Sequence, residues 1–262
     1  ATRTHEGHRH MTRYTALVAG LGLAVGVSAL ARDAHAGDVD VALDFTYASA
    51  HYWRGGQAPA GTNGFVQPTL DVSHPVGDGS LGLNVWYMAG PKDEAKDNSE
   101  IDYTVSGSYP LGDVAVSAGV IDYVFPVGPA FRAPNDQDEQ GHILEAYAGA
   151  DVGALIDPDL GLAVNAYMNL DGDEDDSLYI QTAVSYPLGH LTLGLTLGVA
   201  GESPSYYGVD STALVDVSPN VAFDIPLGDE ASAAAAFTIA INPETDAILP
   251  FFTIGTTYNW NP

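Results

Sequence analysis

The stretch that decides the fold reads Tyr186-Pro187-Leu188-Gly189-His190. Proline fixes φ and removes a backbone donor, and glycine accepts the positive φ that a chain reversal needs, so this unit ends one strand and begins the next. Similar units lie at 74–78, 109–113, 157–161 and 225–229. Between successive turns the chain runs out and back once, with a longer connection at the far end. Short turns at one end and long loops at the other are typical of an outer-membrane β-barrel.

The segments between the turns alternate between apolar and small polar residues. In 191–199 every second residue is Leu or Val, and the residues between them are Thr or Gly. A face of Gly, Ser, Thr and Asp gives thin cover for a surface in water. We therefore expect the apolar side chains to face lipid and the small polar ones to face a wet lumen. A soluble, secreted β-sandwich with its apolar face inward is an alternative.

The pattern predicts an all-β fold, a transmembrane up-and-down antiparallel β-barrel of about twelve strands. The expected strands are 38–52, 64–74, 80–89, 100–109, 113–125, 141–152, 160–169, 177–186, 190–200, 211–224, 231–241 and 248–260. Longer connections are expected at 53–63, 90–99, 126–140, 170–176, 201–210 and 242–247. Pro219 predicts a bulge or a bend in its strand.

Residues 1–36 are typical of an upstream segment followed by a cleaved signal peptide. Residues 1–10 precede Met11, Arg13 precedes the apolar run 16–30, and Ala34-His35-Ala36 is a small-x-small cleavage site. The run is short for a transmembrane helix, which needs about 20 residues. We expect the barrel to occupy residues 37–262.

Without this segment the net charge of the chain is more negative. Four of the 8 Lys+Arg and two of the 34 Asp+Glu lie in 1–36, which leaves 4 basic and 32 acidic residues and a formal charge of −28. Such a chain repels nucleic acid, which is excluded as a partner, and attracts cations. The chain has no cysteine, so disulfides and thiolate metal sites are excluded.

The N-terminal half resembles a known family. Asp44-Phe45-Thr46-Tyr47 and Tyr52-Trp53-Arg54-Gly55-Gly56-Gln57 resemble the opening of the TorF-type porins, with its aspartate, its tyrosine and its Arg-Gly pair. Further similar pieces follow in order at 67–74, Trp86, 100–102, 119–126 and 145–149. The resemblance covers about residues 40–152 and implies a channel-like outer-membrane barrel, in a family defined by likeness more than by assigned substrates.

Arg54 is the only Lys or Arg in 37–91 and stands beside Trp53 in the first long connection. Two interpretations are open. Arg54 sets a positive spot against an acidic lumen, and the resulting field orients polar solutes at the mouth. Alternatively, Arg54 ties the loop to a strand carboxylate such as Asp44 through a bidentate pair.

Acidic residues on the polar face of the strands are the second candidate set. They are Asp40, Asp44, Asp102, Glu145, Asp216 and Asp224. Along a lumen they favour cations, whereas in a plugged lumen they accept hydrogen bonds from neighbours. With 4 basic side chains in 37–262, full pairing is impossible, so we expect some of these carboxylates to be solvated. Small inward residues favour an open path, narrowed by Trp86, Tyr147, Tyr167 and Tyr179.

No catalytic site and no cofactor are predicted. Ser49 and His51 share a face, but nothing indicates a third group that would orient a base. Phosphate loops, dinucleotide turns and metal-binding helices are missing from the sequence. The acidic stretch 171–176 resembles a calcium loop in composition, with Asp171, Asp173 and Asp175 at alternate positions. Because the distal bidentate glutamate is missing, a solvated loop tip is the ordinary interpretation.

Together these patterns predict a porin-like channel in the bacterial outer membrane. Small polar solutes would diffuse through it passively, with a preference for cations from the acidic lumen and loops. Outer-membrane lipid and lipopolysaccharide would surround it, and the sequence does not specify an oligomeric state. A non-conducting barrel that acts as an adhesion or structural module is the alternative.

Overall fold

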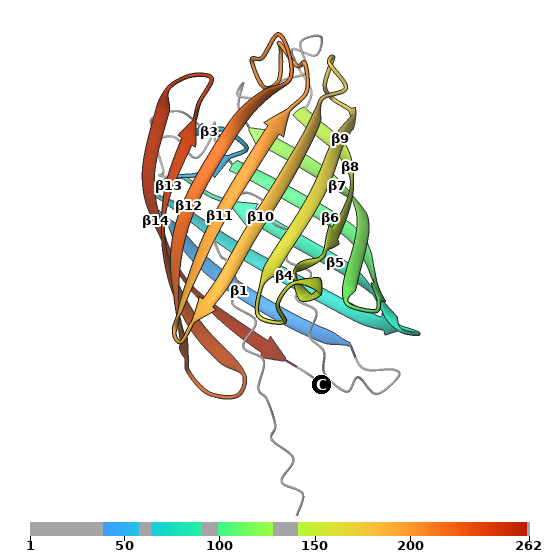
Figure 1. Ribbon diagram of the computed structural model, residues 1–262, viewed down its shortest axis with the longest axis vertical. Helices are drawn as coiled ribbons and strands as arrows, with labels where there is room; N and C mark the ends of the chain where they lie inside the picture. The colour runs from blue at the N-terminus through green and yellow to red at the C-terminus, as the bar shows by residue number, and fades with distance from the viewer. Residues whose placement is uncertain (1–38, 58–63, 91–98, 128–140, 261–262) are drawn as a thin grey trace, which may run out of the picture.

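The structure is a computed structural model that describes residues 39–57, 64–90, 99–127 and 141–260. Within these ranges twelve long strands form one closed antiparallel barrel (Figure 1). In chain order they are β1 (Asp40–Ala48), β4 (Phe65–Val76), β5 (Gly79–Met88), β6 (Ser99–Leu111), β7 (Val114–Val127), β8 (Gly141–Asp151), β9 (Gly161–Asp171), β10 (Leu178–Leu188), β11 (Leu191–Ala200), β12 (Ala213–Pro226), β13 (Ala231–Asn242) and β14 (Ala247–Trp260). The predicted fold class is confirmed.

Each of these strands pairs with its neighbours along the chain, and the two end strands close the barrel. β1 pairs with β14 from Val41 opposite Trp260 to Ala48 opposite Thr253. Closure satisfies the backbone of every strand and leaves no edge for another chain to extend. In the described part of the chain, no helix has the length and apolarity to cross a membrane.

Short turns gather at one end of the barrel, here called the turn end. Gly77, Gly112 and Gly189 each occupy the first position of a two-residue loop and have φ of 61°, 67° and 69°. Positive φ at that position is what a type II′ hairpin requires, which is why the repeated unit carries glycine there. The unit at 157–161 also forms a tight turn, in which the Leu160 N–H donates to the carbonyl oxygen of Asp157 at 3.1 Å, but this turn does not join two strands directly. It lies in a longer connection that contains the 3-10 helix η1 (Gly153–Leu155) between β8 and β9.

The predicted alternation is confirmed as apolar outside and small or polar inside. On β1, Leu43, Phe45 and Tyr47 are 43%, 60% and 44% exposed, whereas Thr46 and Ala48, which face the other way, are buried. Large apolar side chains are exposed on every barrel strand except β8. So much exposed apolar surface is unfavourable in water and is the expected outer face of a barrel in lipid.

Pro219 does not produce the predicted bulge. It pairs with Leu195 without a change of register. The register shift between β11 and β12 lies instead at Gly198 and Val199, opposite Leu214 and Asp216.

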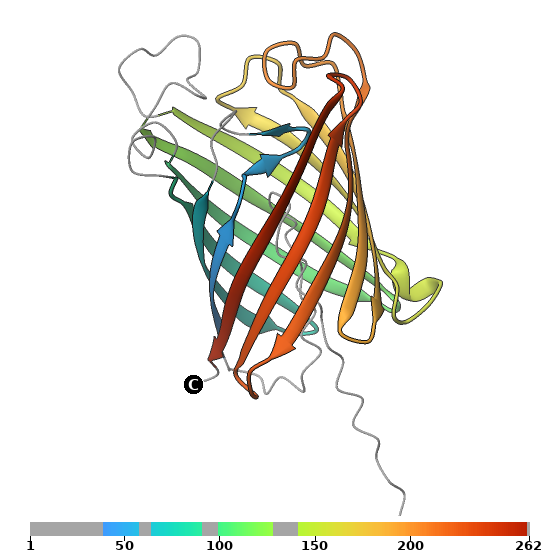
Figure 2. The ribbon, with the colours of Figure 1, turned by 90° about the vertical axis from the view of Figure 1, so that its left-hand side faces the viewer.

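The first long connection folds back as a second, smaller sheet. The expected strand 38–52 ends at Ala48, and two short strands follow, β2 (Tyr52–Trp53) and β3 (Gly56–Gln57). They pair with each other and with none of the barrel strands. We call residues 52–57 the inserted hairpin. It lies toward the end opposite the turn end, here called the loop end, and away from the end at which β14 finishes (Figure 2).

Candidate functional site

The inserted hairpin is a tight turn with positive φ at both central residues, Arg54 (43°) and Gly55 (99°). Positive φ at both positions is the property of a type I′ hairpin. Glycine is required at position 55 for two reasons, the positive φ and a close contact with the barrel wall. An added Cβ would lie 2.5 Å from the carbonyl oxygen of Val215, so this backbone meets the barrel wall too closely for any other residue.

Side-chain contacts fix the hairpin to the part of the barrel wall next to β1. The Asn242 side chain donates to the carbonyl oxygen of Gly55 at 2.7 Å. The Tyr52 hydroxyl donates to Asp216 at 3.1 Å, and the Tyr52 ring stacks on Phe251 with 6.2 Å between centroids. These partners lie on β12, β13 and β14. Since β14 pairs with β1, these contacts hold the hairpin against the wall beside the strand from which it emerges.

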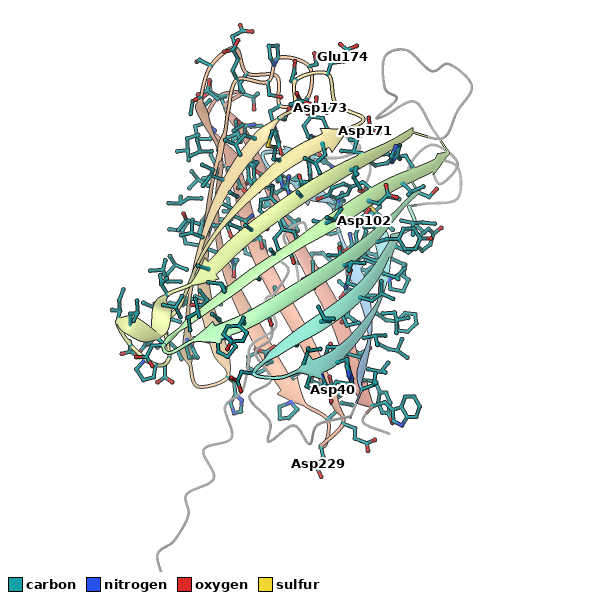
Figure 3. The ribbon with its side chains drawn as sticks, turned by 90° about the vertical axis from the view of Figure 1, so that its right-hand side faces the viewer. Asp40, Asp102, Asp171, Asp173, Glu174 and Asp229 are labelled. Atoms are coloured by element: carbon teal, nitrogen blue, oxygen red, sulfur yellow. The ribbon has the colours of Figure 1, made fainter. Side chains whose placement is uncertain are left out.

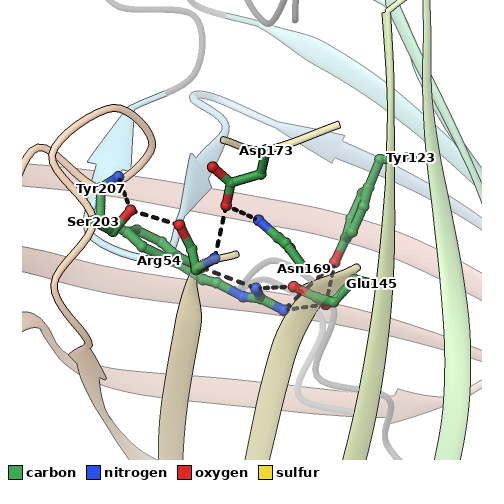
Figure 4. Close-up of polar contacts among 8 residues, drawn as sticks. Arg54, Tyr123, Glu145, Asn169, Asp173, Ser203 and Tyr207 are labelled. Carbon is green, nitrogen blue, oxygen red and sulfur yellow. Dashed lines mark hydrogen bonds and ion pairs between the residues drawn. The ribbon is translucent and has the colours of Figure 1, made fainter. Parts of the chain in front are cut away.

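Arg54 reaches the other side and pairs with Glu145 of β8 (Figure 4). Its two terminal nitrogens donate to the two carboxylate oxygens at 2.5 and 2.8 Å. The Tyr123 hydroxyl also donates to Glu145, at 2.9 Å, and Arg54 donates to the Tyr207 hydroxyl at 3.1 Å. The predicted bidentate pair with a strand carboxylate exists, but its acid is Glu145. Asp44, the suggested partner, accepts hydrogen bonds from threonine hydroxyls of β1 and β14 instead.

Aromatic rings enclose the guanidinium group. Its central carbon lies 4.0 Å from the Tyr167 centroid, 4.7 Å from that of Trp53 and 4.9 Å from that of Tyr179. Trp53 stacks on Tyr207 with 5.9 Å between centroids and 12° between planes. Tyr207 comes from the connection between β11 and β12. Cation–π contacts and the carboxylate together stabilise a charge that burial alone would penalise.

The burial of this group has consequences for titration. Burial on its own would lower the pKa of Arg54, but Glu145, Tyr207 and Tyr123 together outweigh it and hold the pKa above its ordinary value. Burial raises the pKa of Tyr207 to about 12, and the positive charge of Arg54 opposes that rise. Arg54 is therefore charged throughout the physiological pH range.

The six predicted lumen acids fall into two groups. Glu145, Asp102 and Asp216 are at most 2% exposed. Asp216 accepts hydrogen bonds from Tyr52, Tyr179 and Ser218. One oxygen of Asp102 has no hydrogen-bond partner among the described residues. The expectation that some of the carboxylates are solvated does not extend to these three acids, which are buried among neighbouring side chains.

The other three acids, Asp40, Asp44 and Asp224, lie nearer the turn end and keep partial exposure. Figure 3 shows Asp102 well above Asp40 along the barrel. Asp71 of β4 belongs with this group. It falls on the inward face of its strand but was not among the predicted residues. Its side chain is exposed and accepts a 2.7 Å hydrogen bond from Asn84. The turn-end half of the interior therefore presents carboxylates to water.

The loop-end half is packed, in contrast to the open path that small inward residues predicted. Every barrel strand contributes at least one buried inward side chain. Tyr147, Tyr167 and Tyr179 form a row of ring contacts with centroids 5.7 and 6.2 Å apart. Trp86 contacts His51 at 5.5 Å. The three tyrosines thus belong to one packed cluster with Trp53, whereas Trp86 packs against a second cluster that contains Phe65 and Met88.

The acidic side chains of 171–176 contact different partners, and Asp171, Asp173 and Glu174 lie at the end of the barrel away from Asp229 (Figure 3). Asp173 accepts hydrogen bonds from the Asn169 side chain and from the backbone of Asp175 and Ser177. Asp175 accepts from the backbone of Ser205, and Asp171 lies 3.5 Å from His142. Burial would raise the pKa of Asp173, but these hydrogen bonds lower it below its ordinary value. Within the described ranges no group of three acidic or histidine side chains is arranged to hold a metal ion.

Two residues of the site, Tyr123 and Tyr207, were not among those predicted from the sequence. Tyr123 occupies an inward position that the alternation of 113–125 could have revealed. Tyr207 lies in an irregular connection, where no periodicity indicates which way a side chain points.

Comparison with known proteins supports the barrel architecture. The chain is similar to the COG4313 outer membrane channel from Pseudomonas putida F1, with a TM-score of 0.51, 10% identity, and 87% of this chain and 97% of that chain covered. It is similar to the NanC porin, with a TM-score of 0.50, 10% identity, and coverage of 83% and 98%. At these identities the likeness shows the fold alone. No curated protein matches the sequence significantly.

A family model gives the affiliation. The model described as "Bacterial protein of unknown function (Gcw_chp)" matches residues 22–252. The more specific resemblance to TorF-type porins stays a prediction. Because the match covers most of the chain, this protein belongs to the Gcw_chp family of bacterial proteins of unknown function.

Proposed function

We propose that the protein is a porin-like channel of the bacterial outer membrane for passive diffusion of small polar solutes, with a preference for cations. Its apolar outer face would contact outer-membrane lipid and lipopolysaccharide, and residues 1–36 would direct export before their removal. Support comes from a closed barrel whose apolar face points outward and whose polar face points inward.

One observation carries the cation preference. Arg54 is the only Lys or Arg in the described ranges, and Glu145 neutralises it. Asp44 and Asp71 at the turn-end half have no basic neighbour among the described residues, so the field along that half is negative. A negative lumen attracts cations and repels anions.

The inserted hairpin limits conduction in this proposal. It occupies the loop-end half, so solutes pass beside it or after it moves. The packing of the loop-end half is also the observation that favours the alternative, a non-conducting barrel that acts as a surface module.

Planar-bilayer recording of the refolded protein tests the proposal. We expect stepwise currents in a potassium chloride gradient, with a reversal potential that indicates preferred passage of potassium. Asp44→Asn together with Asp71→Asn should move the reversal potential toward that of a non-selective pore, whereas Asp229→Asn at an exposed turn should not. Anion preference would contradict the proposal, and silence of a correctly folded barrel would favour the surface module.

A further inference from the structure

The barrel wall forms a cage around the guanidinium group of Arg54. Its wall residues come from four consecutive strands, Tyr123 of β7, Glu145 of β8, Tyr167 of β9 and Tyr179 of β10. All four are at most 2% exposed. None of them belongs to the inserted hairpin. The cage is therefore a feature of the barrel, and Arg54 is its occupant.

The geometry of the cage selects a planar cation. Glu145 offers two oxygens to two nitrogens of one guanidinium group, at 2.5 and 2.8 Å. The Tyr167 ring lies at 4.0 Å from the central carbon and the Tyr179 ring at 4.9 Å. A carboxylate fork with aromatic faces matches guanidinium, which is planar and weakly hydrated, better than the compact ammonium group.

The hairpin is a replaceable occupant. Arg54 holds a positive φ of 43°, which is unfavourable for a residue other than glycine. The cage cannot stay empty at low cost, because Glu145 would then be a buried charge without a partner. A solute with its own guanidinium group satisfies Glu145 equally well and lets the hairpin leave its strained turn.

We propose that this cage is a binding site for solutes that carry a guanidinium group, and that Arg54 is a built-in occupant which such a solute displaces. The inference rests on the proposed channel function and names a solute class for it. The solute replaces Arg54 on Glu145 and frees the hairpin from the β7–β10 wall.

Chemical rescue tests the cage directly. Arg54→Ala empties it, and methylguanidinium is the probe. We expect saturable stabilisation of folded R54A in detergent, seen as a rise in its thermal midpoint, with methylguanidinium at least about tenfold more effective than methylammonium. The double variant R54A/E145Q should lose that response. Equal effects of the two cations on R54A, or an unchanged response in the double variant, would overturn the inference.

A variant that does not fold still gives an answer. If R54A alone fails to fold, refolding is repeated with each cation, and the folded form is identified by its heat-dependent gel mobility. Rescue by methylguanidinium but not by methylammonium supports the cage, and failure with both contradicts it. These measurements need no conduction, whereas the bilayer currents in potassium chloride need no guanidinium, so the two proposals fail separately.

Discussion

Glu145 and Arg54 are 1% and 4% exposed, and each is the main charge partner of the other. Two buried ions in contact are tolerable because each replaces part of the hydration that the other lost. A single buried ion without a partner is strongly destabilising. Removal of either member of this pair should therefore lower the free energy of unfolding strongly.

Glu145→Gln should destabilise the barrel by about 3–5 kcal/mol, because it leaves the guanidinium buried without a counter-charge. Urea unfolding in detergent micelles measures the difference. Asp229→Asn at an exposed turn is the control and should stay within about 0.5 kcal/mol of the parent. Equal effects of the two variants would show that the pair contributes little.

His51 should make stability depend on pH. Burial lowers its pKa from 6.5 to about 4, and Gln67 lies 3.2 Å from one ring nitrogen. The unfolded chain therefore takes up a proton at higher pH than the folded one, so stability is complete above pH 6.5 and is lost as the pH falls toward 4. The loss approaches about 3 kcal/mol.

Unfolding free energies across that pH range check the expectation. His51→Gln should flatten the dependence, while His74→Gln at an exposed position should leave it unchanged. A slope that survives in H51Q would assign the pH dependence to other groups.

At the scale of elements, the inserted hairpin owes its shape to local conformation and its place to long-range contacts. Gly55→Ala should cost more than Gly112→Ala, although both glycines have positive φ. An added Cβ at Gly112 meets no atom within 4 Å, whereas at Gly55 it meets the backbone of Val215. We expect a backbone cost of about 1–2 kcal/mol for G112A and a larger cost for G55A.

Urea midpoints of the two variants provide the comparison, and protease cleavage within residues 52–57 reports release of the hairpin. G55A should be cut faster than G112A. Equal midpoints and equal cleavage would mean that the hairpin tolerates a side chain at its turn.

The strands were predictable because alternation is a local property, and the hairpin was not. Period-two patterns and Gly-containing turns place β10 and β11 nearly residue for residue. The return of 52–57 into the barrel depends on partners such as Asp216 and Asn242, which lie 164 and 187 residues from the groups they bind. Glu145 and Asp216 are packed against residues of that insertion, so their packing could not be read from the face they occupy.

At the scale of the whole molecule, the outer face should respond to charge as a lipid-facing surface does. Val105 in the middle of β6 is 62% exposed. Val105→Lys should destabilise the barrel in a phospholipid bilayer by about 2–4 kcal/mol. Asp78→Lys at the turn end is the control, since it lies in a two-residue loop between β4 and β5. Urea unfolding from bilayers measures both, and a neutral V105K would contradict a lipid-facing position.

The seam between β1 and β14 also sets an order for assembly. The inserted hairpin is made early, yet the groups that hold it on β12, β13 and β14 are made last. Contacts of such large sequence separation form late because the chain must first close a long loop. The hairpin can be locked in place only when the ends of the chain meet, so the last strand to arrive both seals the wall and traps what lies inside it.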